Sequence, residues 1–480
     1  MKPHYNCNFD SMNIKQLYTN CLAQGAYYIS NNGEAAIIDP LRETKPYLDL
    51  LKQNNDTLSY IFETHFHADF VSGHVDLAKE TGARIVFGPN AQTDYNSHVA
   101  RDNEEFKIGN LTLRVLHTPG HTLESTTYLL LDEAKKPLCI FTGDTLFIGD
   151  VGRPDLAIKS ELTQEDLAGM LYESLRNKIM PLPDDVIVYP AHGAGSACGK
   201  NMSKETFDTL GSQKQLNYAL RDISKSEFIK ELTTGILPAP QYFAKNAALN
   251  KSGYQNYNEI LKKGSKALSV EEFETAMNAG NPIVLDVRKP QEFAAMHIPD
   301  SLYIGLDGQF APWVGTLILD IKAPILLITP EGREAETVMR LSRVGYDNCI
   351  GYLKGGISSW KNAGKKIEQI RSIPAEEFIG QYKTGYKTLD VRKPGEYESA
   401  HLKNAVSQPL DFIYEWMDNV DKSNPYMIHC AGGYRSMIAA SILKAKGFSN
   451  LTDVQGGYGA ISKLNKIKPE IVTLACSSTS

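Results

Sequence analysis

Thr64-His65-Phe66-His67-Ala68-Asp69-Phe70 comes one residue after an apolar run, Tyr60-Ile61-Phe62, whose composition is typical of a buried strand. The polar side chains of this stretch therefore fall on a loop at the carboxyl end of that strand. Two imidazoles and a carboxylate so close in sequence can converge on one cation. By itself the motif is a weak signal, because similar short patterns also occur in ordinary polar turns.

Three more predicted strands end in a segment of the same kind. These segments are Thr118-Pro119-Gly120-His121-Thr122, Thr142-Gly143-Asp144-Thr145 and Tyr189-Pro190-Ala191-His192-Gly193. Each alone is best explained as a polar turn, but four strand ends that all present His or Asp beside Gly or Pro indicate a metal site. Short β-branched runs alternate with helical stretches between residues 20 and 190. This alternation predicts an α/β domain with its chemistry at the strand ends.

The ordered set resembles the metallo-β-lactamase superfamily across residues 1–245, and the resemblance implies an αββα sandwich. The HxHxDH signature of that superfamily departs here in one place, because Phe70 stands where its last His is expected. In the dinuclear zinc hydrolases of this fold, that His binds the second metal. Phe70 therefore favours a site for one ion and argues against two-metal hydrolysis.

Persulfide dioxygenases of this fold are similar in that departure, and the run from Gly143 to Asp155 resembles their signature. The resemblance implies one Fe(II) held by His65, His121 and Asp144, with His67, Asp69 and His192 as groups that orient these ligands. The implied reaction is oxidation of the terminal sulfur of a low-molecular-weight thiol persulfide by O2 to sulfite, with release of the thiol. Zinc is the alternative metal, and a zinc-dependent thioesterase of the hydroxyacylglutathione hydrolase type is the alternative activity.

Three other side chains of this domain are candidates. Arg153 is as well suited to binding a carboxylate or phosphate of the thiol carrier as to a local ion pair with Asp155. Cys198 lies in a loop of small residues shortly after His192, where it is a candidate for handling sulfur, although burial as an inert side chain is more common for a lone Cys. Cys21 faces the same choice with less support.

The rest of the chain contains a repeat. Leu285-Asp286-Val287-Arg288-Lys289-Pro290 recurs about 100 residues later as Leu389-Asp390-Val391-Arg392-Lys393-Pro394. Later matches keep nearly the same offset, so two α/β modules lie in tandem. The predicted organisation is a first domain at residues 1–245, a connector at 246–265, modules at 266–370 and 371–470, and a tail at 471–480.

The second module has a candidate nucleophile. After the predicted strand Tyr426-Met427-Ile428, the chain reads His429-Cys430-Ala431-Gly432-Gly433-Tyr434-Arg435 and then enters an Ala-rich helix. A cysteine in a Gly-rich loop that opens a helix faces several backbone N–H groups, which favour the thiolate and can bind an anion.

This module resembles the rhodanese family over its whole length. The loop from Cys430 to Arg435 has the length that family uses for sulfur, whereas related phosphatases use a loop one residue longer. The resemblance implies that Cys430 accepts a sulfane sulfur and passes it on, forming or using thiosulfate, with Gly432, Gly433 and Arg435 contacting the substrate. The matching stretch of the first module, Ile328-Thr329-Pro330-Glu331-Gly332-Arg333, has no cysteine, so we expect an inactive rhodanese-like module there.

Composition limits the partners. The chain has 480 residues and a net charge of −6, with no basic cluster for nucleic acid and no apolar run long enough to span a membrane. Residues 1–10 lack the pattern of a secretory signal, and the seven scattered cysteines do not form a disulfide framework, so we expect a cytoplasmic protein with free thiols. The expected role is detoxification of sulfide-derived persulfides. The sequence is compatible with a homo-oligomer, and it leaves open which thiol carries the sulfur and in which direction sulfur is transferred.

Overall fold

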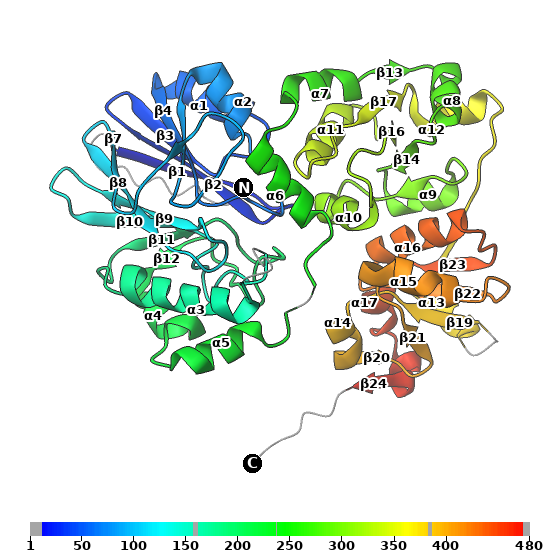
Figure 1. Cartoon of the computed structure of the whole chain (residues 1–480). Coiled ribbons are helices and arrows are strands. Elements are labelled where there is room, and N and C mark those ends of the chain that lie inside the picture. The colour runs from blue at the N-terminus through cyan, green and yellow to red at the C-terminus, as the bar shows by residue number, and fades with distance from the viewer. Residues whose placement is uncertain (1–11, 157–161, 237, 383–385, 474–480) are drawn as a thin grey trace, which may run out of the picture. The chain divides into compact units, whose positions relative to one another are not determined.

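The computed structural model describes residues 12–156, 162–236, 238–382 and 386–473 (Figure 1). It divides into two units: unit 1 comprises Met1–Glu259 and Leu341–Tyr346, and unit 2 comprises Ile260–Arg340 and Asp347–Ser480. Residues 1–10, for which the sequence predicts no secretory signal, lie outside the described residues. Residues 474–480 of the predicted tail also lie outside them. Among the described residues, no helix is both long and apolar enough to cross a membrane.

Unit 1 contains two six-stranded sheets. The first has the order β1 (Met12–Thr19), β2 (Gln24–Asn31), β3 (Glu34–Ile38), β4 (Thr57–Glu63), β5 (Arg84–Phe87) and β6 (His98–Val99). The second has the order β12 (Asp208–Thr209), β11 (Ile187–Pro190), β10 (Pro137–Gly143), β9 (Thr126–Leu131), β8 (Leu111–His117) and β7 (Glu105–Ile108). The helices are α1 (Lys45–Asn54), α2 (His74–Thr81), α3 (Gln164–Ser174), α4 (Leu210–Leu216), α5 (Lys225–Thr233) and α6 (Phe243–Ser252), with short turns at Leu175–Ile179 and Tyr218–Leu220.

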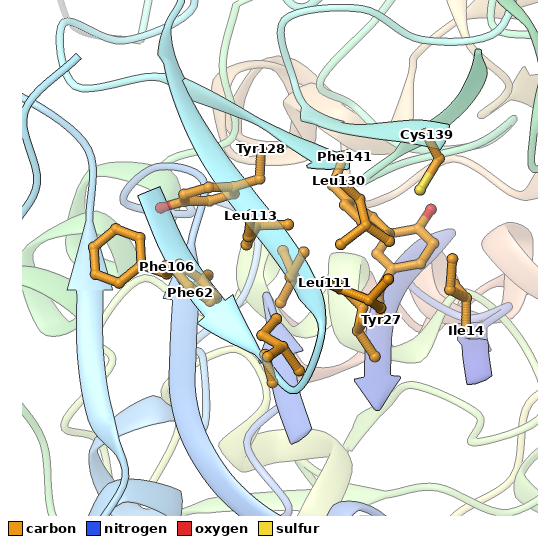
Figure 2. Close-up of a cluster of buried hydrophobic side chains, with 14 of the residues drawn as sticks. Ile14, Tyr27, Phe62, Phe106, Leu111, Leu113, Tyr128, Leu130, Cys139 and Phe141 are labelled. Carbon is orange, nitrogen blue, oxygen red and sulfur yellow. The ribbon is translucent and has the colours of Figure 1, made fainter. Parts of the chain in front are cut away.

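The two sheets pack face to face, because alternate residues of each strand point to opposite faces. Tyr27 on β2 and Phe62 on β4 pack against Phe141 on β10 and Tyr128 on β9, with ring centroids 4.9 Å apart in each pair (Figure 2). Tyr28, the next residue along β2, belongs instead to the core that the first sheet forms with α1 and α2. Both faces of the sheet are thus covered by protein, which explains its nearly continuous apolar runs.

The predicted connector at residues 246–265 consists instead largely of helix. It holds most of α6 and all of α7 (Tyr257–Gly264), and unit 1 extends to Glu259. Asn246 and Asn250 of α6 are buried. The stretch is polar in sequence, but these two side chains lie inside the molecule, where Asn250 forms hydrogen bonds with the backbone of the loop after β4.

Unit 2 contains two five-stranded sheets with the same strand topology. The first module has the order β13 (Ala267–Leu268), β17 (Cys349–Leu353), β16 (Ile325–Ile328), β14 (Ile283–Asp286) and β15 (Leu302–Tyr303); the second has β18 (Arg371–Ile373), β23 (Leu451–Val454), β22 (Tyr426–His429), β19 (Lys387–Asp390) and β21 (Ala405–Ser407). All pairings within these two sheets are parallel. The repeat found in the sequence is therefore a repeat of the fold.

Helices connect the strands of both modules. In the first they are α8 (Val270–Asn278), α9 (Pro290–Ala295), α10 (Phe310–Leu317), α11 (Glu334–Ser342) and α12 (Gly356–Asn362). In the second they are α13 (Ala375–Gln381), α14 (Pro394–Ser399), α15 (Ile413–Trp416), α16 (Tyr434–Ala445) and α17 (Gly457–Ile461), with short turns at Leu410–Phe412, Met417–Asn419 and Asn465–Glu470. The first residues of the predicted tail form β24 (Ile471–Thr473), which pairs with β20 (Ala400–Leu402).

The repeated Asp-Val-Arg element has a structural role in both modules. Arg288 and Arg392 each bind the Asp two residues earlier, with 2.6 Å between Nη2 and Oδ2, and each also donates to a backbone carbonyl, that of Met296 or Ala400. All four charged side chains are buried. The element thus ties the end of β14 or β19 to the residue that follows the next helix, whether or not the module has a cysteine.

Candidate functional site

The three predicted metal ligands meet at the ends of three strands. His65 follows β4, His121 follows β8, and Asp144 follows β10. One donor atom from each lies within 4.8 Å of the other two. Asp144 Oδ2 is 3.4 Å from His121 Nε2 and 3.8 Å from His65 Nε2, and all three side chains are buried.

These donor atoms fit a metal ion. Within the described residues, His121 Nε2 and Asp144 Oδ2 are buried without a hydrogen-bond partner. Leaving such an atom unsatisfied costs about 1–3 kcal/mol. Ligands bound to one ion at about 2.1 Å lie roughly 3 Å apart, close to the separations found here. The three residues can therefore hold one cation between two imidazoles and a carboxylate.

Hydrogen bonds to the far side of each imidazole direct its Nε2 toward this position. His121 Nδ1 is 2.8 Å from the carbonyl oxygen of Arg153, which can only accept, so Nδ1 carries the hydrogen. His65 Nδ1 is 3.0 Å from Thr64 Oγ1, whose own hydroxyl hydrogen is donated to Asp39. Both rings consequently present the Nε2 lone pair to the ion.

Two glycines of the predicted signature are required by close packing at this site. Gly143 has φ +54°, and a Cβ there would lie 2.6 Å from the side chain of Thr64. A Cβ on Gly152 would lie 2.1 Å from the carbonyl oxygen of Asp144 and 2.9 Å from His121 Nδ1. Any side chain at either position would displace a residue that holds a ligand.

The electrostatics favour an ionised Asp144 carboxylate and a neutral His65 ring. Burial alone would raise the pKa of Asp144, but His192, His65 and His121 around it hold that pKa well below its usual range. Burial, reinforced by neighbouring His67, lowers the pKa of His65 well below that of a free imidazole. A neutral His and an ionised Asp are the protonation states that bind a cation.

His67 lies beside the ligands but belongs to a different group. Its Nε2 is 3.0 Å from Asp39 Oδ1 and 3.6 Å from Glu63 Oε2, in a second buried cluster. Burial and the neighbouring Asp39 raise the pKa of Glu63 well above its usual range. The ring of Phe70, fully buried, packs on His67 with centroids 4.3 Å apart. An aromatic ring thus stands where the superfamily signature has a metal ligand.

Asp69 and His192 form a third buried group, together with Cys198. Their donor atoms lie within 4.8 Å of one another. His192 bridges the groups, because its Nδ1 is 2.8 Å from Asp144 Oδ1 and its Nε2 is 2.8 Å from Asp69 Oδ2. Burial raises the pKa of the Cys198 thiol well above its usual range. The structure thus brings this cysteine beside the site, as a protonated thiol when no cation is near.

Arg153 and Cys21 are placed differently. The guanidinium of Arg153 makes two contacts of 2.6 Å with the Asp155 carboxylate and donates to the carbonyl of Ala197, so of the two alternatives the structure has the local ion pair. Cys21 is half-buried, 3.5 Å from a guanidinium nitrogen of Arg343. Among the residues described, Cys21 is not part of the three buried groups of possible ligands.

Asn250 of α6 is a further residue of the site. Its side-chain nitrogen donates to the carbonyls of His67 and Phe70 at 2.7 and 2.8 Å, and its oxygen accepts from the backbone N–H of Ser72 at 2.9 Å. It therefore holds the metal-binding loop from a position about 180 residues further along the chain. Sequence reasoning missed it, because an Asn in a polar stretch carries no local signal of a distant partner.

A cavity of about 720 Å³ opens beside the site. Its wall includes Phe66 and Ala68 from the loop after β4, and Thr122 and Glu124 from the loop after β8. Residues of α6 complete it, with the aliphatic face around Ala247 toward the cavity. Phe66 and Thr122 each follow a candidate ligand by one residue, so the cavity begins next to the site.

In unit 2, the second module presents Cys430 directly after β22, as predicted. Its sulfur is nearly fully buried and accepts a hydrogen bond of 3.1 Å from the backbone N–H of Gly433, which has φ +94°. A Cβ on Gly457 would lie 2.2 Å from the carbonyl oxygen of Cys430, so the start of α17 closes tightly on the loop. Ala431 and Gly432 are exposed and leave the loop open on that side.

The Arg435 side chain forms an ion pair within its own module. Its two terminal nitrogens bind the carboxylate of Glu396 at 2.6 and 2.8 Å, and its side chain is mostly buried.

The strand register shows which residue of the first module corresponds to Cys430. In the second module, Asp390 at the end of β19 pairs with the last residue of β22, and Cys430 comes next. In the first module the same register brings Asp286 beside Ile328, so Thr329 occupies the place of the cysteine. Cys349 is buried at the start of β17, with its sulfur 3.7 Å from the carbonyl of Gly264.

Fold and sites together define a domain of two packed sheets with a candidate metal site, joined to two parallel α/β modules of the same topology, the second of which has a cysteine after its central strand. Residues 20–192 match the model of the Metallo-beta-lactamase superfamily, and residues 269–363 and 375–464 each match that of the Rhodanese-like domain. A solved metallo-beta-lactamase from Staphylococcus aureus subsp. aureus COL is 32% identical and superposes with a TM-score of 0.65, covering 72% of this chain and 99% of that one. The chain belongs to the metallo-β-lactamase superfamily and carries two rhodanese-like domains after that domain.

Curated relatives match the first part of the chain. The mitochondrial persulfide dioxygenase ETHE1 of Homo sapiens is 32% identical over 210 residues, which are 43% of this chain and 74% of that protein. A probable hydroxyacylglutathione hydrolase of Schizosaccharomyces pombe is 29% identical over 222 residues, 42% of this chain and 82% of that protein. The relationship to persulfide dioxygenases is confirmed, and these matches support an enzyme with a bound metal and with persulfide oxidation and sulfur transfer in general.

Proposed function

We propose that unit 1 is an iron-dependent dioxygenase that converts a thiol persulfide, O2 and water to sulfite, the free thiol and two protons. The observation that carries this proposal is the set His65, His121 and Asp144, with Phe70 in place of a ligand for a second ion. Two imidazoles and one carboxylate on one side of a metal are typical of non-haem Fe(II) oxygenases. When bound there, Fe(II) would supply the activation of dioxygen and a binding position for the persulfide sulfur.

The chain's own residues prepare this site in three ways. The Arg153 carbonyl and the Thr64 hydroxyl fix the ring orientation of the two His ligands. Phe66 and the aliphatic face of α6 give the cavity an apolar wall, which limits water beside the reacting sulfur. His192 holds Asp144 Oδ1, so that Oδ2 is left for the ion.

We also propose that Cys430 transfers sulfane sulfur, joining it to sulfite as thiosulfate or withdrawing it from thiosulfate. The thiolate would attack the outer sulfur of the donor, whose S–S bond breaks with release of sulfite or of the carrier thiolate, and would hold that sulfur as a persulfide. Attack of the acceptor on the outer sulfur would then break the new S–S bond and return the Cys430 thiolate. The N–H of Gly433 stabilises the attacking sulfur, and the exposed edge at Gly432 admits the anion. Tethering both sites on one chain raises the local concentration of the shared sulfite. The proposed setting is removal of sulfide-derived persulfides in the cytoplasm.

The test is oxygen uptake by the whole, iron-loaded chain after addition of glutathione persulfide, with sulfite and thiosulfate quantified at the end. We expect uptake that is lost in His121→Ala, whereas Cys430→Ser keeps uptake and sulfite but forms no thiosulfate. Absence of uptake with glutathione, coenzyme A and cysteine persulfides would overturn the dioxygenase proposal.

A zinc thioesterase is the second candidate, favoured by two observations. Asp69, His192 and Cys198 form a further group of three donors beside the first, and hydrolases are among the relatives. Two zinc ions per chain, together with cleavage of a hydroxyacylglutathione thioester, would support this function over the dioxygenase.

A further inference from the structure

The cysteine loop of the second module contacts the first module, and both lie in unit 2. Tyr434, the residue before Arg435, donates its hydroxyl to the carbonyl of Gly305 at 2.6 Å. Its ring lies directly on Gly308, where a Cβ would be 2.4 Å from the ring carbon that bears the hydroxyl. Gly308 therefore leaves room for this ring. We call residues 305–308, between β15 and α10, the Tyr434 socket.

The first module holds the socket with its own charged residues. Arg333, in the loop that has Thr329 instead of a cysteine, binds Asp307 at 2.6 Å. Arg340 on α11 donates to the carbonyl of Leu306 at 2.7 Å. The corresponding loop of the first module has no cysteine, but its arginine anchors the segment that receives Tyr434.

The helix after the cysteine loop is held by the same module. The hydroxyl of Ser441, buried on α16, accepts from the backbone N–H of Tyr303 on β15 at 3.1 Å. Helix α16 also packs beside α9 (Figure 1). Tyr434 and Ser441 are seven positions apart, so they lie on one face of α16. This face contacts the first module.

We propose that the first module positions the sulfur-transfer loop, with Tyr434 as the positioning residue and residues 305–308 as its socket. Tyr434 immediately follows Gly433, whose N–H contacts the Cys430 sulfur. Fixing Tyr434 therefore fixes the direction of that donor. This inference rests on the proposed sulfur transfer at Cys430, and it gives the cysteine-less module a role in that reaction.

The test compares two tyrosines in the whole chain. Tyr434→Phe removes the hydrogen bond to the socket and keeps the ring. Tyr414→Phe is the matched control, because the Tyr414 hydroxyl also crosses between the modules, donating at 2.7 Å to the carbonyl of Leu317, which ends α10 and lies outside the socket. Two measurements follow: the rate of thiocyanate formation from thiosulfate and cyanide, and the rate of alkylation of Cys430 by iodoacetamide against pH, read by mass spectrometry of its peptide.

We expect Tyr434→Phe to slow thiocyanate formation by about three- to tenfold, as expected for loss of one buried hydrogen bond. It should also move the midpoint of Cys430 alkylation to higher pH. Tyr414→Phe should leave both measurements within about twofold of the unsubstituted chain, since its bond is of similar strength but elsewhere. Gly308→Ala, which changes the socket alone, should act in the same direction as Tyr434→Phe.

Equal effects of Tyr434→Phe and Tyr414→Phe would overturn the proposal, because loosened docking of the modules would then explain both. Unchanged alkylation in both Tyr434→Phe and Gly308→Ala would overturn it as well. A chain that forms no thiocyanate at all would contradict the proposed sulfur transfer, while the alkylation profiles, which need no turnover, would still decide whether the socket positions the loop.

Discussion

The hydrogen bonds of Asn250 allow a quantitative prediction about the metal-binding loop. Asn250→Ala removes three hydrogen bonds to the backbone of His67, Phe70 and Ser72, all in a buried environment. Each such bond contributes a net of about 0.5–1.5 kcal/mol, so the loop should lose roughly 2–4 kcal/mol of local stability. The same substitution should weaken retention of the bound metal, since the loop also carries His65.

The assay is amide hydrogen exchange of peptides that cover residues 67–76. Each 1.4 kcal/mol corresponds to about a tenfold change in an opening equilibrium, so exchange at Ser72 should accelerate roughly 30- to 1,000-fold. Because exchange reports opening of this loop itself, the result does not require two-state unfolding of a chain with several domains.

Asn246→Ala is the matched control. Asn246 lies one turn earlier on α6 and is equally buried, but neither polar atom of its side chain has a hydrogen-bond partner within the described residues. Its truncation should therefore change exchange in residues 67–76 by less than about tenfold. If both variants accelerated exchange equally, or if Asn250→Ala had no effect, the hydrogen bonds of Asn250 would not be what holds the loop.

Three further predictions concern other parts of the chain. Phe70→His supplies the missing donor beside Asp69, so zinc bound per chain after loading should rise from one equivalent toward two, measured by mass spectrometry of metals; a constant single equivalent would contradict this. Arg288→Ala and Arg392→Ala should each destabilise their module by about 3–5 kcal/mol in urea unfolding, because each leaves a buried carboxylate unpaired; a loss confined to the module with the cysteine would show that the element is not structural. Burial raises the pKa of Asp453 to about 6. The folded state therefore binds the proton more tightly than the unfolded chain, and its stability relative to Asp453→Asn should fall by up to about 3 kcal/mol as pH rises from about 4 to 6; parallel stability curves for the two proteins would refute it.

The sequence by itself determined the fold class and indicated the candidate residues of both sites. Motifs at strand ends indicate His65, His121 and Asp144 because a metal site at the edge of a sheet uses short, local segments whose residue types are legible. The repeat located both modules for the same reason, since each strand and loop recurs in order. The loop around Cys430 follows β22 as predicted, because its length and glycines define its conformation locally.

Only the tertiary structure decided which long-range partners these residues have. Asn250 and Tyr434 donate hydrogen bonds to backbone carbonyls that are distant in sequence. Every residue has a backbone carbonyl, so the sequence does not show which of them accepts such a bond. Packing brings Asp155 and the Ala197 carbonyl to the Arg153 guanidinium, contacts that the sequence left open. Residues 246–265 have the composition of a connector, yet they fold as helices because Asn250 and its neighbours are buried against unit 1. Local chemistry is encoded in short segments, whereas the contacts that orient it arise only when those segments pack.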